Sequence, residues 1–204
     1  MLDVLIIGGG VAGVSCALVL GSAHKKAFAA DKKIAILTHQ KTSSLQEALF
    51  NNAYGIPAGK LGSELLTESV AQLAELYPDV TQIDDEKVMS VSGNYPDFIV
   101  TTNKNTYITK NIVVAIGYSN TFMIDGFMQY VEDHRKTLPA KNRIQLKNID
   151  NKVADGIYVA GTLAGTRSQL SIAAGSGAAV ATDILTDWNN GIHSQSHDKV
   201  IRNL

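Results

Sequence analysis

The feature that most constrains the fold is a glycine-rich segment near the start of the chain. Gly8, Gly10 and Gly13 form a Gly-x-Gly-x-x-Gly motif directly after an apolar run at residues 2–7. The run is typical of a buried parallel strand, and the small apolar residues at 11–20 predict a helix. The motif therefore lies at a strand-to-helix junction, which is the context that separates it from a chance match.

Each glycine has a physical task at such a junction. Gly8 permits a tight turn, Gly10 lets the backbone approach a pyrophosphate, and Gly13 allows the helix to pack closely on the strand. The start of the helix adds unpaired N–H groups and the positive end of its dipole. We expect the pyrophosphate of a dinucleotide to lie against residues Gly8, Gly10, Val11, Ala12 and Gly13. The alternative is a tightly packed turn without a ligand.

A second apolar run at residues 34–37 predicts a parallel partner for the first strand, joined to it by a right-handed crossover. A carboxylate normally ends this strand and binds the adenosine ribose. Here the position is Thr38, followed by His39 and Gln40, whose neutral groups form weaker hydrogen bonds. We expect these three residues to face the adenosine. No arginine stands there to pair with a 2′-phosphate.

The remaining apolar patterns predict an α/β domain with a central parallel sheet and an antiparallel three-stranded β-meander. Residues 63–76 and 172–188 have helical spacing, whereas the runs at 112–116 and 157–161 are typical of buried strands. The meander is expected at about 84–111, with strands around 88–91, 98–102 and 106–109. We expect a single domain over residues 1–204.

Composition excludes several functions. The net charge of −1 predicts no general attraction to nucleic acid. Asp3 and three glycines argue against a signal peptide in the apolar N-terminal segment, and we expect no membrane span and a cytoplasmic location.

Cys16 is the single cysteine, so an intrachain disulfide is impossible, and packing as a small hydrophobe is its expected role. The five histidines lack the spacing of metal ligands, so we expect no metal.

Three further blocks resemble those of a known family. They are Asn51–Pro57, Ile112–Gly117, and Gly156–Thr162 followed by Gln169 and Ala173–Gly175. Together with the glycine motif, they resemble the low-molecular-weight thioredoxin reductases of the pyridine nucleotide-disulfide oxidoreductase flavoproteins, over residues 3–117 and 144–188. The resemblance implies FAD as cofactor. It places the cofactor near Gln46, Asn52, Val88, Ala115, Ile116, Gly117, Gly161, Thr162, Gln169, Leu170 and Ala173.

The chain also departs from that family. The family inserts an NADPH-binding domain carrying a Cys-x-x-Cys pair, whereas here the short segment 118–143 takes its place. Thr162 stands where the family has an aspartate on the ribityl chain, and Arg167 lies one position away from the family's arginine. With Cys16 alone, this chain is not expected to reduce thioredoxin by the family mechanism.

We therefore expect an FAD-dependent oxidoreductase or flavin electron carrier, dimeric, with an unidentified electron donor and acceptor. One alternative is a non-catalytic FAD-binding sensor module. The other is an NAD(P)-binding domain, which has no need of the block around Gly161. His134 is a candidate proton donor to the flavin, although a solvated polar face explains its charged neighbours equally well. The central expectation is that Gly10 and Gly161 meet at one sheet edge and hold one cofactor.

Overall fold

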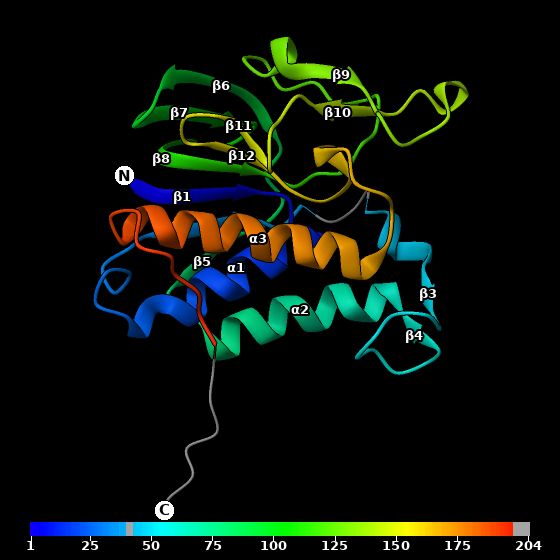
Figure 1. Ribbon diagram of the computed structural model, residues 1–204, viewed down its shortest axis with the longest axis horizontal. Helices are drawn as coiled ribbons and strands as arrows, with labels where there is room; N and C mark the ends of the chain where they lie inside the picture. Colours follow the sequence, from blue (N-terminus) through cyan, green and yellow to red (C-terminus); the bar gives the residue numbers. More distant parts are fainter. Residues whose placement is uncertain (40–42, 198–204) are drawn as a thin grey trace, which may run out of the picture.

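The computed structural model describes residues 1–39 and 43–197. A mostly parallel sheet forms the centre, in the order β11-β12-β8-β1-β2-β5 (Figure 1). Along this path, β11 at the edge runs antiparallel to β12, and the other neighbouring strands are parallel. These strands are β1 (Leu2–Ile7), β2 (Ile34–Leu37), β5 (Val80–Ile83), β8 (Thr106–Val114), β11 (Lys152–Ala154) and β12 (Ile157–Val159).

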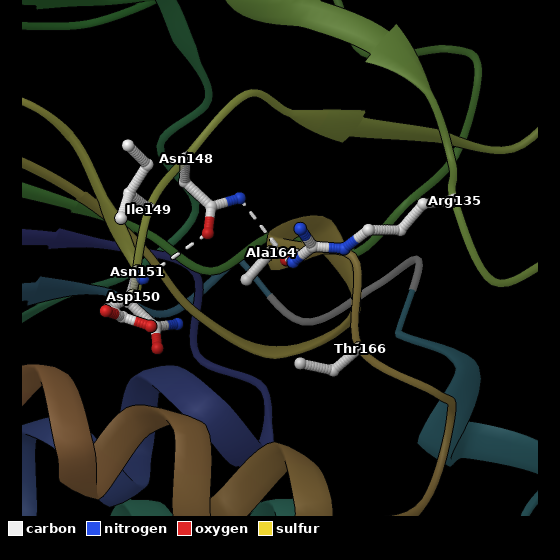
Figure 2. A pocket seen from close by; sticks show the side chains of 7 residues that line it. All are labelled: Arg135, Asn148, Ile149, Asp150, Asn151, Ala164 and Thr166. Carbon is white, nitrogen blue, oxygen red and sulfur yellow. Dashed lines mark hydrogen bonds between the residues drawn. The ribbon is translucent and has the colours of Figure 1, made fainter.

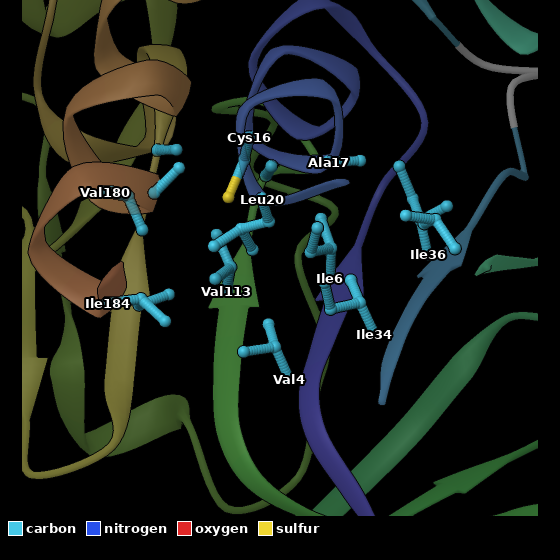
Figure 3. Close-up of a cluster of buried hydrophobic side chains, with 14 of the residues drawn as sticks. Val4, Ile6, Cys16, Ala17, Leu20, Ile34, Ile36, Val113, Val180 and Ile184 are labelled. Carbon is cyan, nitrogen blue, oxygen red and sulfur yellow. The ribbon is translucent and has the colours of Figure 1, made fainter. Parts of the chain in front are cut away.

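One face of the sheet is covered by helices: α1 (Val11–Ser22), α2 (Gly62–Leu76) and α3 (Leu170–Trp188) (Figure 1). Figure 3 shows the core between α1, α3 and the sheet, where Cys16 lies among valine, leucine and isoleucine side chains. Val4, Ile6 and Val113 from the strands meet Val180 from α3, and all four are fully buried. This apolar contact fixes the two helices on the sheet.

The other face carries β6 (Val88–Asn94) and β7 (Asp97–Thr102), which form the meander with β8. A two-stranded sheet of β9 (Val131–Asp133) and β10 (Ile144–Leu146) lies beside it (Figure 1). A second core fills the space beneath, with Phe127 and Leu146 fully buried. The predicted fold class, a parallel α/β sheet with a three-stranded meander, is confirmed.

The predicted break between two strands at 106–109 and 112–116 is wrong, because β8 runs continuously through it. The polar residues that interrupt the apolar pattern are hydrogen-bonded within the sheet. The amide of Asn111 donates to the backbone oxygen of Asp3 over 3.0 Å, and the Thr109 hydroxyl donates to the Asn111 carbonyl over 2.9 Å. The first half of β8 thus closes the meander, while its second half pairs with β1 and β12.

Asp3 ties the start of β1 to both neighbouring strands. Its carboxylate accepts hydrogen bonds from the backbone N–H of Lys33 and from Nζ of Lys110, each over 3.0 Å. Burial raises the pKa of the Asp3 carboxyl, but the hydrogen bonds from Lys33 and Lys110, together with the positive charges of Lys110 and Lys32, hold the pKa below its ordinary value. The carboxylate therefore stays charged and stabilises the folded sheet near neutral pH.

Several short elements escaped prediction. Strand β5 has only two apolar residues, Val80 and Ile83, and one of its faces is partly exposed. The region 38–62, for which no regular element was predicted, holds a short hairpin of β3 (Leu49–Phe50) and β4 (Lys60–Leu61). Strands β9, β10 and β11 were also unpredicted. Within the described residues there are also five 3₁₀ turns: Ala23–Lys25, Ser44–Glu47, Met128–Tyr130, Pro139–Lys141 and Gly161–Ala164.

Candidate functional site

The glycine loop joins β1 to α1 in a close-packed turn. Gly8 has φ +119°, a conformation open to glycine, and a Cβ atom there would lie 2.5 Å from the Ala115 carbonyl oxygen. A Cβ at Gly13 would lie 1.8 Å from the Gly8 carbonyl oxygen. A Cβ at Gly10, in contrast, would meet no atom within 4 Å. Two of the glycines are therefore required by packing, and the third borders open space.

Helix α1 begins beside that open space with its N-terminal N–H groups uncapped by a side chain. Gly10 is the N-cap and its side-chain position offers no acceptor. The first helical hydrogen bond runs from the Val14 N–H to the Gly10 carbonyl over 2.9 Å, so the N–H groups of residues 11–13 precede it. Such a terminus, with its dipole, favours an anionic group such as a phosphate.

The second glycine block lies directly against the first. Gly161 follows β12 with φ +73°, and a Cβ there would lie 3.0 Å from Cβ of Ala12 in α1. The Gly161 N–H donates to the Ser176 hydroxyl oxygen over 2.9 Å, which fixes the turn to α3. Helix α3 also approaches α1 closely, because a Cβ at Gly177 would lie 1.9 Å from the Ala12 carbonyl oxygen. The predicted meeting of the two glycine segments is confirmed.

The end of β2 supplies two of the three residues expected at the adenosine. Thr38 is buried, and its hydroxyl donates to the carboxylate of Asp84, which follows β5. Nδ1 of His39 is buried and has no hydrogen-bond partner among the described residues. Gln40 lies outside the described residues. Asp84 was missed by the sequence reasoning, and recognition of Val80–Ile83 as a parallel strand would have revealed it.

The residues expected on the flavin side lie on several elements: directly after β8, in the turn before β3, in the β3–β4 loop and in β6. Ala115 is buried and its N–H donates to the Ile7 carbonyl over 2.8 Å, whereas Ile116 is exposed. A Cβ at Gly117 would meet no atom within 4 Å. Gln46 and Asn52 are exposed in the 3₁₀ turn before β3 and in the β3–β4 loop, and Val88 is buried in the core behind the meander.

Gln169 and Leu170 form the start of α3, and Ala173 packs against the core beneath it. Gln169 also lines a cavity of about 380 Å³ at the junction of α3 with the segment after Gly117. Lysine and arginine side chains surround this cavity. Its lining residues are Tyr118, Lys136, Thr137, Leu138, Lys141, Arg167, Ser168 and Gln169.

The segment 118–143 holds the second glycine block in place. Nε2 of His134 lies 3.0 Å from the Thr162 carbonyl oxygen, and its Nδ1 accepts a hydrogen bond from the Lys136 N–H over 3.1 Å. Nε2 therefore carries the proton and donates it to Thr162. The side chain is buried, and both ring nitrogens are engaged with backbone. This arrangement gives His134 a structural role in place of the proton-donor role considered from sequence.

Arg135 continues this attachment by donating from its guanidinium to the Ala164 carbonyl over 2.7 Å. Figure 2 shows Arg135 and Asn148 converging on Ala164 from opposite sides. They line a cavity of about 390 Å³ together with Ile149, Asp150, Asn151 and Thr166. The β10–β11 loop and the 3₁₀ turn at Gly161–Ala164 both contribute to its lining, and Gly10 does not.

Cys16 lies in the core of α1, fully buried. Burial raises the pKa of its thiol far above the ordinary value, so the group stays protonated and unreactive. Among residues 1–39 and 43–197, no cluster of three or more histidine, cysteine, aspartate or glutamate side chains is arranged to hold a metal ion. In the same ranges, none of the helices combines the length and hydrophobicity needed to cross a membrane.

A parallel sheet with a glycine-lined helix start and a second glycine block against it defines a Rossmann-like dinucleotide-binding protein. The family model of the pyridine nucleotide-disulphide oxidoreductases matches residues 2–161, and the chain belongs to this family. Membership implies flavin binding, typically as FAD. No curated protein matches the chain in sequence.

Solved structures with the same fold include several thioredoxin reductases. The thioredoxin reductase of Gloeobacter violaceus superposes with a TM-score of 0.72 at 15% identity, covering 98% of each chain. A ferredoxin-flavin thioredoxin reductase from Clostridium acetobutylicum gives 0.67 at 16% identity, covering 92% of this chain and 98% of that one. The atypical thioredoxin reductase TRi from Desulfovibrio vulgaris Hildenborough gives 0.68 at 13%, covering 94% and 99%. This likeness shows the fold.

Proposed function

We propose that the chain is a single FAD-binding domain that acts as an oxidoreductase or flavin electron carrier. The observation that carries the proposal is the contact between the two glycine segments. Gly161 abuts Ala12 at the start of α1, while the neighbouring Gly10 leaves open space before uncapped N–H groups. An extended cofactor with a central pyrophosphate fits this arrangement, because one segment then holds the phosphates while the other reaches the flavin half.

The proposed roles follow the order of the cofactor along the sheet edge. The pyrophosphate lies on the loop of Gly8, Gly10 and Gly13 and on the N–H groups of Val11 and Ala12. The adenosine lies at Thr38, His39 and Gln40, and the orphaned Nδ1 of His39 is a buried polar atom that a ligand would satisfy. The flavin half contacts Gln46, Asn52, Val88, Ala115, Ile116, Gly117, Gly161, Thr162, Gln169, Leu170 and Ala173.

Bound FAD would supply the electron transfer, and the protein would bind it, orient it and shield it from water. His134 and Arg135 position the Thr162–Gly165 turn through backbone carbonyls. The single cysteine cannot form a redox disulfide. Electrons would therefore pass to and from separate molecules. The short segment 118–143, which takes the place of the family's NADPH-binding domain, supports the same conclusion.

The cavity beside Gln169 favours an anionic electron donor. Three of its lining residues, Lys136, Lys141 and Arg167, are cationic, and none of them pairs with an acidic side chain among the described residues. The phosphates of NADH or NADPH match this charge. A protein donor is the other option, because one similar structure is named a ferredoxin-flavin reductase. We also propose a cytoplasmic location and a homodimer, in which a second copy would cover the apolar surface exposed at Met123 and Met128.

The test is to purify the protein natively, heat it, and identify the released small molecule. Release of FAD, or a flavin spectrum after reconstitution with excess FAD, supports the proposal. Absence of flavin absorption in both experiments contradicts it, and release of NAD(P) favours a nicotinamide-binding domain. Photoreduction followed by exposure to air, and mixing with NADH or NADPH, then separates functions: a flavin that never changes redox state indicates a sensor module.

A further inference from the structure

Asp84, directly after β5, places a carboxylate beside Thr38 at the end of β2. In related folds the residue at the position of Thr38 is ordinarily itself a carboxylate. Strands β2 and β5 are parallel neighbours in register, with Leu37 opposite Ile83. The next residue in each strand direction is Thr38 on one side and Asp84 on the other. The Thr38 N–H donates to the Ile83 carbonyl over 2.9 Å, so the two strand ends are held together up to this point.

The side chains of these two residues are joined as well. The Thr38 hydroxyl donates to Oδ1 of Asp84 and lies 3.3 Å from the Ile83 carbonyl oxygen. The hydroxyl proton is thereby used within the protein, so Thr38 is poorly placed to donate to a ligand. The carboxylate, in contrast, is oriented by this bond, and Asp84 is exposed at the carboxyl edge of the sheet. A carboxylate is a stronger acceptor than a neutral hydroxyl.

A second acidic residue of this turn, Glu86, is engaged within the protein. Glu86 is buried and accepts hydrogen bonds from the Thr102 hydroxyl, the Asn105 amide and the Tyr107 hydroxyl, over 2.6, 2.6 and 2.9 Å. Its carboxylate fastens the meander. The carboxylate of Asp84, in contrast, is directed toward the end of β2, where it accepts the Thr38 hydroxyl.

We propose that Asp84 accepts the hydrogen bonds of the adenosine ribose hydroxyls, replacing from β5 the carboxylate that β2 lacks. Adjacent strands lie about 4.8 Å apart. Because the Asp84 carboxylate contacts the Thr38 hydroxyl, its oxygen lies closer to the end of β2 than the backbone of β5 does. The same negative charge opposes a 2′-phosphate, so the site selects adenosine nucleotides with a free ribose. This inference rests on the proposed binding of an adenine dinucleotide.

The experiment is calorimetric titration of the full chain, freed of bound nucleotide, with ADP, 2′-deoxy-ADP, 3′-deoxy-ADP and adenosine 2′,5′-diphosphate. The variant Asp84→Asn keeps the shape of the side chain and an acceptor for Thr38. The matched control is Asp79→Asn, which removes the same charge from the opposite end of β5, where the side chain is exposed. Urea unfolding of all three proteins establishes that each is folded.

We expect ADP to bind about tenfold more weakly to Asp84→Asn than to the original protein, as for loss of one charge-assisted hydrogen bond. For at least one deoxy analogue, the substitution Asp84→Asn should reduce affinity much less than it does for ADP. For adenosine 2′,5′-diphosphate, the same substitution should increase affinity. Asp79→Asn should match the original protein. The role of Asp84 is overturned if Asp84→Asn and Asp79→Asn bind ADP with equal affinity. It is also overturned if Asp84→Asn loses the same affinity for ADP as for both deoxy analogues. Failure of the original protein to bind both ADP and FAD overturns the proposed function itself.

Discussion

The substitution Gly10→Val separates cofactor binding from folding. Gly10 has φ −80° and ψ −174°, an extended conformation that valine adopts freely, and a Cβ there meets no protein atom within 4 Å. The free energy of unfolding of the protein without FAD should therefore stay within about 1 kcal/mol of the original value. Valine also lowers the conformational entropy of the unfolded chain, which favours folding of the variant. FAD binding should suffer, because the side chain enters the space before the N–H groups of residues 11–13.

The size of the loss follows from the contacts removed. Displacing the pyrophosphate from one of these N–H groups costs about 1.5–3 kcal/mol, the range for hydrogen bonds to charged groups, which is about a 10- to 150-fold loss of affinity. Gly10→Ala should cause a smaller loss, giving a series graded by size. The assay is titration of the apoprotein with FAD, followed by quenching of flavin fluorescence, with urea unfolding in parallel.

Gly13→Ala provides the contrasting variant. Its Cβ would lie 1.8 Å from the Gly8 carbonyl oxygen, so the turn must shift, and we expect about 3 kcal/mol or more of destabilisation. The two variants should therefore differ: Gly10→Val folds without FAD, whereas Gly13→Ala folds poorly. Unchanged FAD affinity in Gly10→Val would refute the placement of the pyrophosphate.

Three further predictions concern the surroundings of the site. Asp3→Asn should lower stability by about 1–2 kcal/mol at pH 7. Because the folded pKa of Asp3 lies below its ordinary 3.8, the original protein should lose this advantage as pH falls from about 5 through the folded pKa, so urea midpoints of the two proteins converge in acid. Ser176→Ala removes the acceptor of the Gly161 N–H and should cost about 1–3 kcal/mol, with weaker FAD binding, measured by unfolding and titration. Cys16 should resist thiol reagents in the native protein and react after unfolding in urea; rapid native labelling would contradict its burial.

The glycine turn and the central strands could be predicted because their signals are local. The spacing of Gly8, Gly10 and Gly13 after an apolar run leaves few alternatives, and β1, β2 and β12 are short apolar runs that are fully or almost fully buried. Helix α3 was placed within two residues of its start. These elements determine the fold class and the edge at which the two glycine segments meet.

Other parts depend on contacts between distant residues and could not be read from local patterns. The continuity of β8 depends on the hydrogen bond from the Asn111 amide to the carbonyl oxygen of Asp3, more than a hundred positions away. Strand β5 is half polar, so its parallel pairing, and with it the position of Asp84, appears only once β2 is beside it. The role of His134 likewise depends on the carbonyl of Thr162, which the sequence alone does not bring near.

The most direct test of the account is a competition titration on the apoprotein. FAD should bind in a 1:1 ratio, ADP should displace it, and FMN, which lacks the adenylate half, should compete poorly. That pattern requires the pyrophosphate and adenosine to be held at the edge where Gly10 and Gly161 meet. Displacement by FMN as effective as that by ADP, or no FAD binding at concentrations of about 100 μM, corresponding to about −5.5 kcal/mol, would contradict it.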